Sequence, residues 1–242
     1  MKSKILTLTL ALVAVASSSF SQLRIGPTIG YNLDNMALFL PANQTYAETT
    51  QSTSNFNIGA KAQYDYSDQL AFTSGLILTK TGTTISSSYS YNLGNGNNTF
   101  ADANKLSVYN IHIPINVIWK LKIVKDKGVG MVFGGGYLQY AISGTQSYTA
   151  TTSSALSTSS YNSNSNIAFG NDATKDNLRS FDTGINIGAG YEYKNIQLTV
   201  QYIFGLRNLY PQANTTANGN GGTYTLENRT LQVGLSYLLN TK

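Results

Sequence analysis

Residues 55–66 read NFNIGAKAQYDY, an unbroken alternation of polar and apolar side chains. Successive side chains of a β-strand point to opposite faces of the sheet, whereas a helix repeats its apolar positions every three to four residues. The stretch therefore predicts a β-strand with one apolar face and one polar face. The apolar face carries Phe56, Ile58, Ala60, Ala62, Tyr64 and Tyr66.

Seven further segments have the same period of two, so the sequence predicts eight strands. Two features interrupt the pattern. The glycines at residues 134–136 predict a bulge or a sharply curved strand, and we also predict a bulge at Pro114. The seven segments lie at residues 23–32, 70–81, 109–121, 129–142, 181–193, 196–206 and 231–237.

The connections between these segments alternate in length. Short turns are expected at residues 67–69, 122–128 and 194–195. Long polar loops are expected at residues 33–54, 82–106, 144–178 and 208–227. Outer-membrane barrels have this arrangement, with short periplasmic turns, long extracellular loops and both termini in the periplasm.

Alternation alone does not say which face lies inside, because a soluble lipocalin-like barrel would bury the apolar face. Only 11% of the residues are charged, against about 25% in ordinary soluble domains. Aromatic residues gather near both ends of the segments, as two membrane–water interfaces require. We therefore predict an all-β protein, an eight-stranded antiparallel up-and-down transmembrane β-barrel in the bacterial outer membrane.

The N-terminus predicts an export signal. A basic start is followed by the apolar residues 5–16 and by Ser19-Phe20-Ser21, which fits the small-x-small cleavage rule. An uncleaved anchor helix is the alternative, but the apolar stretch is short for one. We predict a signal peptide at residues 1–21 and an outer-membrane β-barrel domain at residues 22–242. Loss of Lys2 and Lys4 lowers the formal net charge from +5 to +3, a scattered excess that argues against nucleic-acid binding.

Four groups of residues resemble the PorT-like outer-membrane β-barrel family, small barrels of the Bacteroidetes-type envelope. The resemblance implies an outer-membrane location and an eight-stranded barrel, and some members are similar to accessory factors of a secretion and gliding apparatus. It implies no catalytic residues. The resembling groups are IHIPI at 111–115, GGGY at 134–137, FDTG at 181–184 running to GAGYE at 188–192, and YIFGLRN at 202–208.

Charged residues fall on the polar faces, which the barrel would enclose. Eight strands leave an interior that side chains fill, so we expect these residues to form a paired polar network rather than a gated ion path. Arg24, Asp65, Lys120 and Glu192 are expected near the periplasmic rim, Lys61 and Asn186 at mid-depth, and Asp182 and Arg207 near the extracellular rim.

Catalytic and metal chemistry find little support. The chain has no cysteine and a single histidine, His112, which a lipid hydrolase would need close to a serine or an acid. No G-x-S-x-G motif and no metal-ligand spacing occur. We predict a protein that is not an enzyme, with no cofactor, and a buried structural role for His112.

The long loops are rich in Ser, Thr, Asn and Tyr, residues that adaptable binding surfaces favour. We predict a structural or interaction role, as an accessory subunit of an envelope or secretion assembly. A narrow channel or lipid-binding barrel is the alternative, and an outer-membrane lipid-modifying enzyme is a third. The expected partners are outer-membrane lipid and other envelope proteins; the sequence leaves the oligomeric state open.

Overall fold

The computed structural model describes residues 22–39, 48–92, 97–122, 128–154, 156–172, 174–211 and 224–241. The predicted signal peptide at residues 1–21 lies outside this part of the chain, as does most of the predicted turn at residues 122–128. No helix in the described ranges has the length and hydropathy of a membrane-spanning segment.

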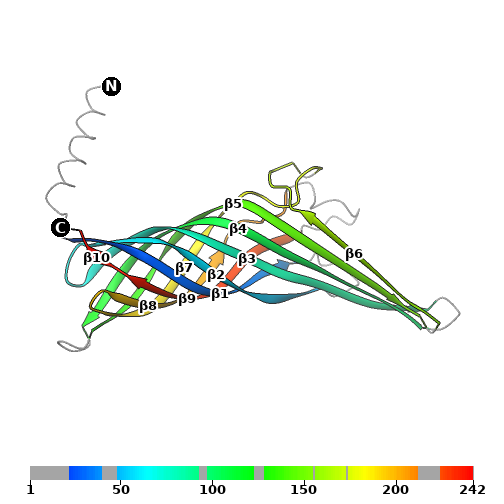
Figure 1. Cartoon of the computed structure of the whole chain (residues 1–242), viewed down its shortest axis with the longest axis horizontal. Coiled ribbons are helices and arrows are strands. Elements are labelled where there is room, and N and C mark those ends of the chain that lie inside the picture. Colours follow the sequence, from blue (N-terminus) through cyan, green and yellow to red (C-terminus); the bar gives the residue numbers. More distant parts are fainter. Residues whose placement is uncertain are drawn as a thin grey trace, which may run out of the picture.

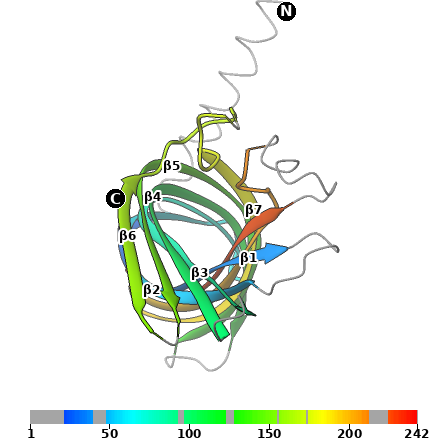
Figure 2. The ribbon, with the colours of Figure 1, turned by 90° about the vertical axis from the view of Figure 1, so that its right-hand side faces the viewer.

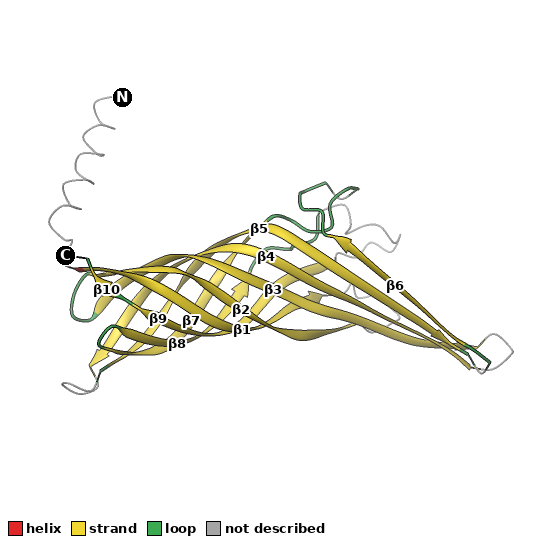
Figure 3. Ribbon diagram, viewed as in Figure 1, coloured by secondary structure: helices red, strands yellow, loops and turns green. Residues whose placement is uncertain are grey.

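Ten β-strands make up nearly all of the described chain (Figure 3). Several are far longer than the mean strand of about 5–6 residues, because they continue beyond the apolar belt of the barrel. The strands are β1 (Leu23–Phe39), β2 (Glu48–Asp65), β3 (Leu70–Asn92), β4 (Asn97–Lys122), β5 (Val129–Ser153), β6 (Thr158–Asn166), β7 (Phe181–Tyr193), β8 (Ile196–Gly205), β9 (Thr225–Tyr237) and β10 (Leu239–Asn240).

Eight of these strands form a closed antiparallel ring in the order β1-β2-β3-β4-β5-β7-β8-β9, and pairing of β9 with β1 completes it. Figure 2 shows the ring from one end. The short strands β6 and β10 pair with β5 and β1. The predicted eight-stranded antiparallel barrel is therefore confirmed. Closure pairs every strand on both sides, which leaves no edge exposed to lipid.

The apolar face of each strand lies outside the barrel. Ile58 is 60% exposed, Ile187 63% and Trp119 52%, whereas Gln63 and Gln197 on the inner face are fully buried. A soluble barrel would show the opposite distribution. The outward face is therefore the one that contacts hydrocarbon, and the polar side chains fill the lumen.

The two ends of the barrel differ. We call the end with the connections at residues 66–69 and 194–195 the turn end; β10 also lies there (Figure 1). The opposite end, beyond which β3 reaches Asn92, is the loop end. At the turn end Lys194 has a φ of 54°, the left-handed conformation that a two-residue hairpin turn requires.

Much of the predicted loop sequence forms strand, so those loop assignments are wrong. β3, β4 and β5 continue past the ring, and β6 joins them, giving an antiparallel sheet of these four strands at the loop end (Figure 1). The start of β2, residues 48–52, pairs with the first residues of this part of β3. We call residues 83–92, 97–107, 143–153 and 158–166 the sheet extension. Ser, Thr and Tyr tolerate strand geometry well, and water on both sides removes the apolar alternation that marks the barrel strands.

Two predicted bulges are also absent from their expected places. Residues 134–136 pair in continuous register with both β4 and β7, and a Cβ on Gly135 would lie 2.0 Å from the Ile115 carbonyl oxygen, so close approach explains that glycine. At Pro114 the β3–β4 pairing skips two positions without a change of register, because proline has no N–H to donate. The register shift in β4 lies instead at Tyr109/Asn110.

Candidate functional site

An ion-pair cluster closes the lumen at the turn end. Arg24 of β1 donates from its two terminal nitrogens to the Glu192 carboxylate of β7, at 2.6 and 3.0 Å. The Nε of Arg24 lies 2.9 Å from Asp65 Oδ2 of β2. Arg24 is thus held between two carboxylates from strands distant in the sequence. All three side chains are less than one-quarter exposed, so solvent screens these charges only weakly.

Two lysines and two glutamines extend this cluster. Lys120 Nζ donates to Asp65 Oδ1 at 2.7 Å, and Gln63 donates to the same oxygen at 2.7 Å. Gln197 donates to Gln63 Oε1 and to Glu192 Oε2. Lys61 donates to Gln197 Oε1 at 2.9 Å. The structure therefore brings together five of the residues singled out from the sequence, Arg24, Lys61, Asp65, Lys120 and Glu192.

Asp182 belongs to a second group, nearer the loop end. Its Oδ2 accepts hydrogen bonds from the Tyr137 hydroxyl at 2.8 Å and from Asn228 Nδ2 at 2.6 Å, and its Oδ1 accepts from the Thr183 amide. Asp182 is 3% exposed. These neutral donors offset the cost of burying the carboxyl group.

The structure also shows a lumen residue that the sequence analysis placed in a loop. Asp34 is 1% exposed and accepts hydrogen bonds from Thr230 Oγ1 at 2.7 Å and Asn55 Nδ2 at 2.8 Å. Every second residue of β1 faces inward, including Arg24 and Asn32, and Asp34 is the next inward position after Asn32. Extending the predicted strand by two residues would have placed Asp34 in the lumen.

The two remaining predicted residues lie apart from these groups. Asn186 is 3% exposed, and neither side-chain amide atom has a hydrogen-bond partner in the described part of the chain. The Arg207 guanidinium lies over the Phe181 ring, 5.5 Å from its centroid, on the outward face of β7. Among the described residues it forms no ion pair with Asp182, although the two charges interact at a longer distance.

His112 lies inside the barrel wall. It is 4% exposed, its Nδ1 is 3.1 Å from Gln139 Oε1, and its ring lies 5.0 Å from the Tyr137 ring. Its Nε2 has no hydrogen-bond partner among the described residues, and His112 borders a small cavity. Neither hydrogen bonds nor ion pairs join it to a serine or a carboxylate among the described residues, so the nucleophile–base–acid geometry of a hydrolase is not assembled there.

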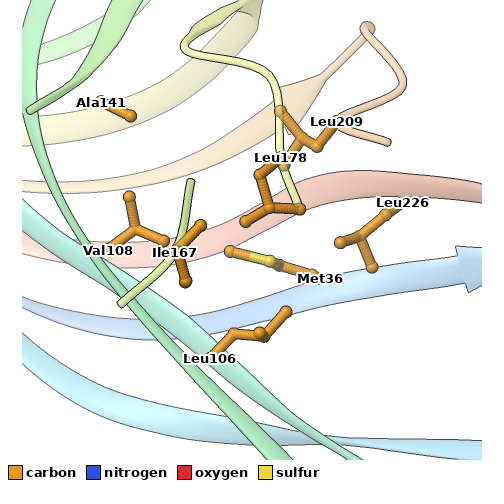
Figure 4. Close-up of a cluster of buried hydrophobic side chains, with 8 residues drawn as sticks. All are labelled: Met36, Leu106, Val108, Ala141, Ile167, Leu178, Leu209 and Leu226. Carbon is orange, nitrogen blue, oxygen red and sulfur yellow. The ribbon is translucent and has the colours of Figure 1, made fainter. Parts of the chain in front are cut away.

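An apolar plug lies across the lumen at the loop end (Figure 4). Residues 167–172, 174–178 and 206–211 connect strands at this end, and Ile167, Leu178 and Leu209 pack among strand side chains. Together with partly buried Phe169 and Tyr210 they pack into one cluster. Its buried members are Met36, Leu106, Val108, Ala141, Ile167, Leu178, Leu209 and Leu226.

Two small cavities lie between the plug and the ion-pair cluster. One of about 10 Å³ adjoins His112 and Asn57, and one of about 40 Å³ adjoins Lys61 and Asn116. A single water requires roughly 10–15 Å³. These two cavities therefore have room for isolated waters and not for a small organic ligand. No cluster of His, Cys, Asp or Glu in the described ranges is arranged to bind a metal ion.

The sheet extension carries aromatic side chains on the face that continues the barrel interior. Tyr89 and Phe100 have ring centroids 5.2 Å apart, and Tyr148 and Tyr161 have theirs 6.4 Å apart. Asp102 lies on this face and bonds the Ser87 hydroxyl. Burial, with a further contribution from the Asp102 carboxylate, raises the pKa of Glu48 at the start of β2.

Comparison with known proteins identifies the fold family. The family model described as "Outer membrane protein beta-barrel domain" matches residues 16–210. No curated protein sequence matches the chain. Solved structures that align with it include Ail of Yersinia pestis, at 14% identity over 89% of this chain and 98% of Ail with a TM-score of 0.31.

Two further solved structures align with similar identity, coverage and TM-score. Neisserial surface protein A matches at 11% identity over 90% of this chain and 97% of its own, with a TM-score of 0.37. OprG of Pseudomonas aeruginosa matches at 10% identity over 90% of this chain and 95% of its own, with a TM-score of 0.36. These identities are too low for any function to be transferred.

Proposed function

Because the chain belongs to the family of outer membrane protein β-barrel domains, we propose that this integral bacterial outer-membrane protein has an interaction role, as an accessory subunit of an envelope or secretion assembly. The sheet extension is the observation that carries the proposal. It continues three barrel strands far beyond the apolar belt and adds β6, a strand that contributes nothing to closing the barrel. A barrel that only anchored itself would not need it.

Residues 1–21 are a signal peptide in this proposal, and residues 22–242 form the barrel domain. Both termini lie in the periplasm, and the loop end with its sheet extension faces the outside. The short turns and the position of β10 support this orientation, because outer-membrane barrels keep short connections on the periplasmic side. The resemblance to PorT-like barrels supports the accessory role.

The partner surface is the aromatic face of the sheet extension. Tyr161 is 60% exposed and Tyr89 47%, so their rings are available to a partner. Tyrosine supplies a large contact area with little loss of side-chain entropy, and the surrounding Ser, Thr and Asn add hydrogen bonds. This combination suits an extracellular protein segment.

The polar groups of the lumen act as a structural plug and not as an ion path. Arg24, Lys61, Asp65, Lys120 and Glu192 tie strands β1, β2, β4 and β7 together at the turn end. Asn186 and Asp182 fill the interior above them, and the apolar plug covers the mouth. A channel or a lumenal lipid site would require a continuous passage, and an enzyme would require a site at His112. Single-channel recording of the reconstituted protein tests the choice between a plugged barrel and a channel. Steady conductance would favour the channel.

A pull-down from outer membranes tests the interaction role. The full chain with a C-terminal tag is extracted in mild detergent, and co-purifying proteins are identified. We expect a stoichiometric envelope protein that is lost from Tyr148→Ala/Tyr161→Ala. The matched control is Thr149→Ala/Asn162→Ala, a cross-strand pair one residue along on the opposite face of the same strands. A barrel without partners, or equal loss in both variants, would contradict the proposal.

A further inference from the structure

A basic groove lies on the outer surface of the barrel at the loop end, separate from the aromatic face of the sheet extension. It has a volume of about 610 Å³ and is lined by Lys80, Lys105 and seven Ser, Thr, Asn and Gln residues from β4, β5 and β6. Five of the seven have outward side chains, whereas Gln146 and Ser165 alternate with them and fall on the aromatic face. The register places its polar floor in two rows. Ser107, Thr145 and Asn166 pair side by side, and so do Lys105, Ser147 and Asn164.

The groove begins where the outward face stops being apolar. On β3 the outward side chains run Leu76, Leu78 and then Lys80, and on β4 they run upward from Ile111 through Tyr109 to Ser107 and Lys105. Lys105 lies four residues beyond Tyr109, about 13 Å along the strand. Because barrel strands are tilted, both lysines fall within the headgroup layer next to the apolar belt.

The charge of the groove is unbalanced. None of its lining residues is acidic, and neither lysine forms an ion pair within the described part of the chain. Lys80 Nζ lies 5.5 Å from the centroid of the Tyr109 ring, which holds the ammonium group at the rim of the belt. The neighbouring acid on β4, Asp102, is on the opposite face of the strand.

This combination matches the chemistry of a lipid phosphate. An anionic phosphate takes charge-assisted hydrogen bonds from ammonium groups, and hydroxyl and amide donors complete its shell. Basic side chains near a membrane surface attract anionic lipid headgroups. Snorkelling of the two lysines toward water would explain why they lie next to the apolar belt. It would not explain the groove lined by polar side chains between them.

We infer that the groove lined by Lys80 and Lys105 binds the phosphate of a lipid headgroup in the leaflet at the loop end. The inference rests on the proposed orientation only for naming that leaflet the outer one. It is independent of the accessory role, because a lipid site on the barrel surface requires no protein partner. The acyl chains of the lipid would lie along the apolar face of β3 and β4 below the groove.

Native mass spectrometry of the full chain in a neutral detergent tests the inference. The probes are phosphatidic acid and diacylglycerol, which differ in the phosphate, with inorganic phosphate as a competitor. We expect Lys80→Gln/Lys105→Gln to weaken phosphatidic acid binding at least about tenfold. Lys175→Gln/Lys194→Gln removes the same charge outside the groove and should bind like wild type. The shift between unheated and boiled samples on a gel verifies that each variant is folded.

Two further variants protect the test against a folding defect. Lys105→Gln alone changes an exposed side chain and should weaken binding several-fold, while Lys80→Arg/Lys105→Arg keeps both charges and should retain binding. Equal loss in the charge-matched control would overturn the inference, and so would equal binding of diacylglycerol. Displacement of the lipid by an equimolar amount of inorganic phosphate would identify a free anion site and overturn the lipid assignment. Failure of the pull-down described above would leave this result unaffected.

Discussion

Removing Arg24 tests whether the contacts at the turn end set the stability of the barrel. The Arg24 side chain is 8% exposed and Glu192 13%. Breaking a buried ion pair by removing one partner costs about 3–5 kcal/mol, because the other charge is left uncompensated. We therefore expect Arg24→Met to lower the free energy of unfolding by about 3–5 kcal/mol.

The two carboxylates that Arg24 contacts should respond differently. Without Arg24, Asp65 still has Lys120 Nζ at 2.7 Å, whereas the one remaining hydrogen bond to the Glu192 carboxylate comes from the neutral amide of Gln197. Glu192 is therefore the carboxylate left without a cation in direct contact, and Lys61 acts on it only from a longer distance. Adding Glu192→Gln to Arg24→Met should recover about 1–3 kcal/mol. Adding Asp65→Asn should lower stability further, because it leaves Lys120 unpaired.

The assay is urea unfolding of the protein reconstituted in phospholipid vesicles. Trp119 is the only tryptophan of the chain, and it is 52% exposed on the lipid-facing side, so its fluorescence reports loss of the membrane-inserted barrel. The single variants Glu192→Gln and Asp65→Asn complete the two double-mutant cycles. If Arg24→Met/Asp65→Asn proved more stable than Arg24→Met/Glu192→Gln, the reasoning from these contacts would be refuted.

Three further predictions concern other parts of the molecule. Leu226 is fully buried in the apolar plug, so Leu226→Ala should create a cavity and lower the free energy of unfolding by about 2–5 kcal/mol in the same urea assay. The control is Leu239→Ala, at a position 49% exposed at the turn end; an equal loss of stability in this variant would contradict the prediction. Asp182→Ala leaves the two side-chain donors that bind its carboxylate unpaired and should cost about 1–3 kcal/mol for each buried group; a change within error would show that water replaces the carboxylate. In the loop at residues 167–172, the Asp172 carboxylate accepts hydrogen bonds from the Thr174 amide and, with a smaller effect, from the Thr174 hydroxyl, and both lower the pKa of Asp172. The Thr174 amide should therefore be protected from hydrogen exchange at neutral pH. This protection should be lost as the pH falls through the lowered pKa of Asp172. Asp172→Asn should remove this pH dependence, and an unchanged profile would disprove the assignment.

The sequence was sufficient for the barrel because lipid imposes a strong contrast between the two faces of a strand. In residues 55–66 every second side chain contacts hydrocarbon, so apolar residues recur at every second position of the sequence. The same parity assigned Arg24, Asp65, Lys120 and Glu192 to the inner face at a shared end. The same alternation places Asp34 on the inner face, but the predicted strand ended at residue 32, two positions short of it.

The sheet extension could not be predicted in the same way. Residues 83–92 and 143–153 are strand in water on both faces, so nothing in their sequence requires alternation. Their structure depends on pairing between neighbouring strands, which ranges from hairpin pairs such as Ser153 with Thr158 to more distant pairs such as Thr99 with Ser153. In the sheet extension the strands are held together by contacts and hydrogen bonds between neighbouring strands, whereas in the membrane the apolar face also fixes the orientation of each strand.

Local alternation of side chains is enough to predict the fold class, the two faces of each strand and the polar character of the lumen. The tertiary structure decided which polar groups meet: Arg24 contacts Glu192 across 168 positions of sequence, Arg207 lies over an outward ring, and two lysines share one groove. Contacts of this kind depend on the stagger between strands, which closure of the whole ring fixes. Stagger has no local signature, so the partners become visible only when all eight strands are paired.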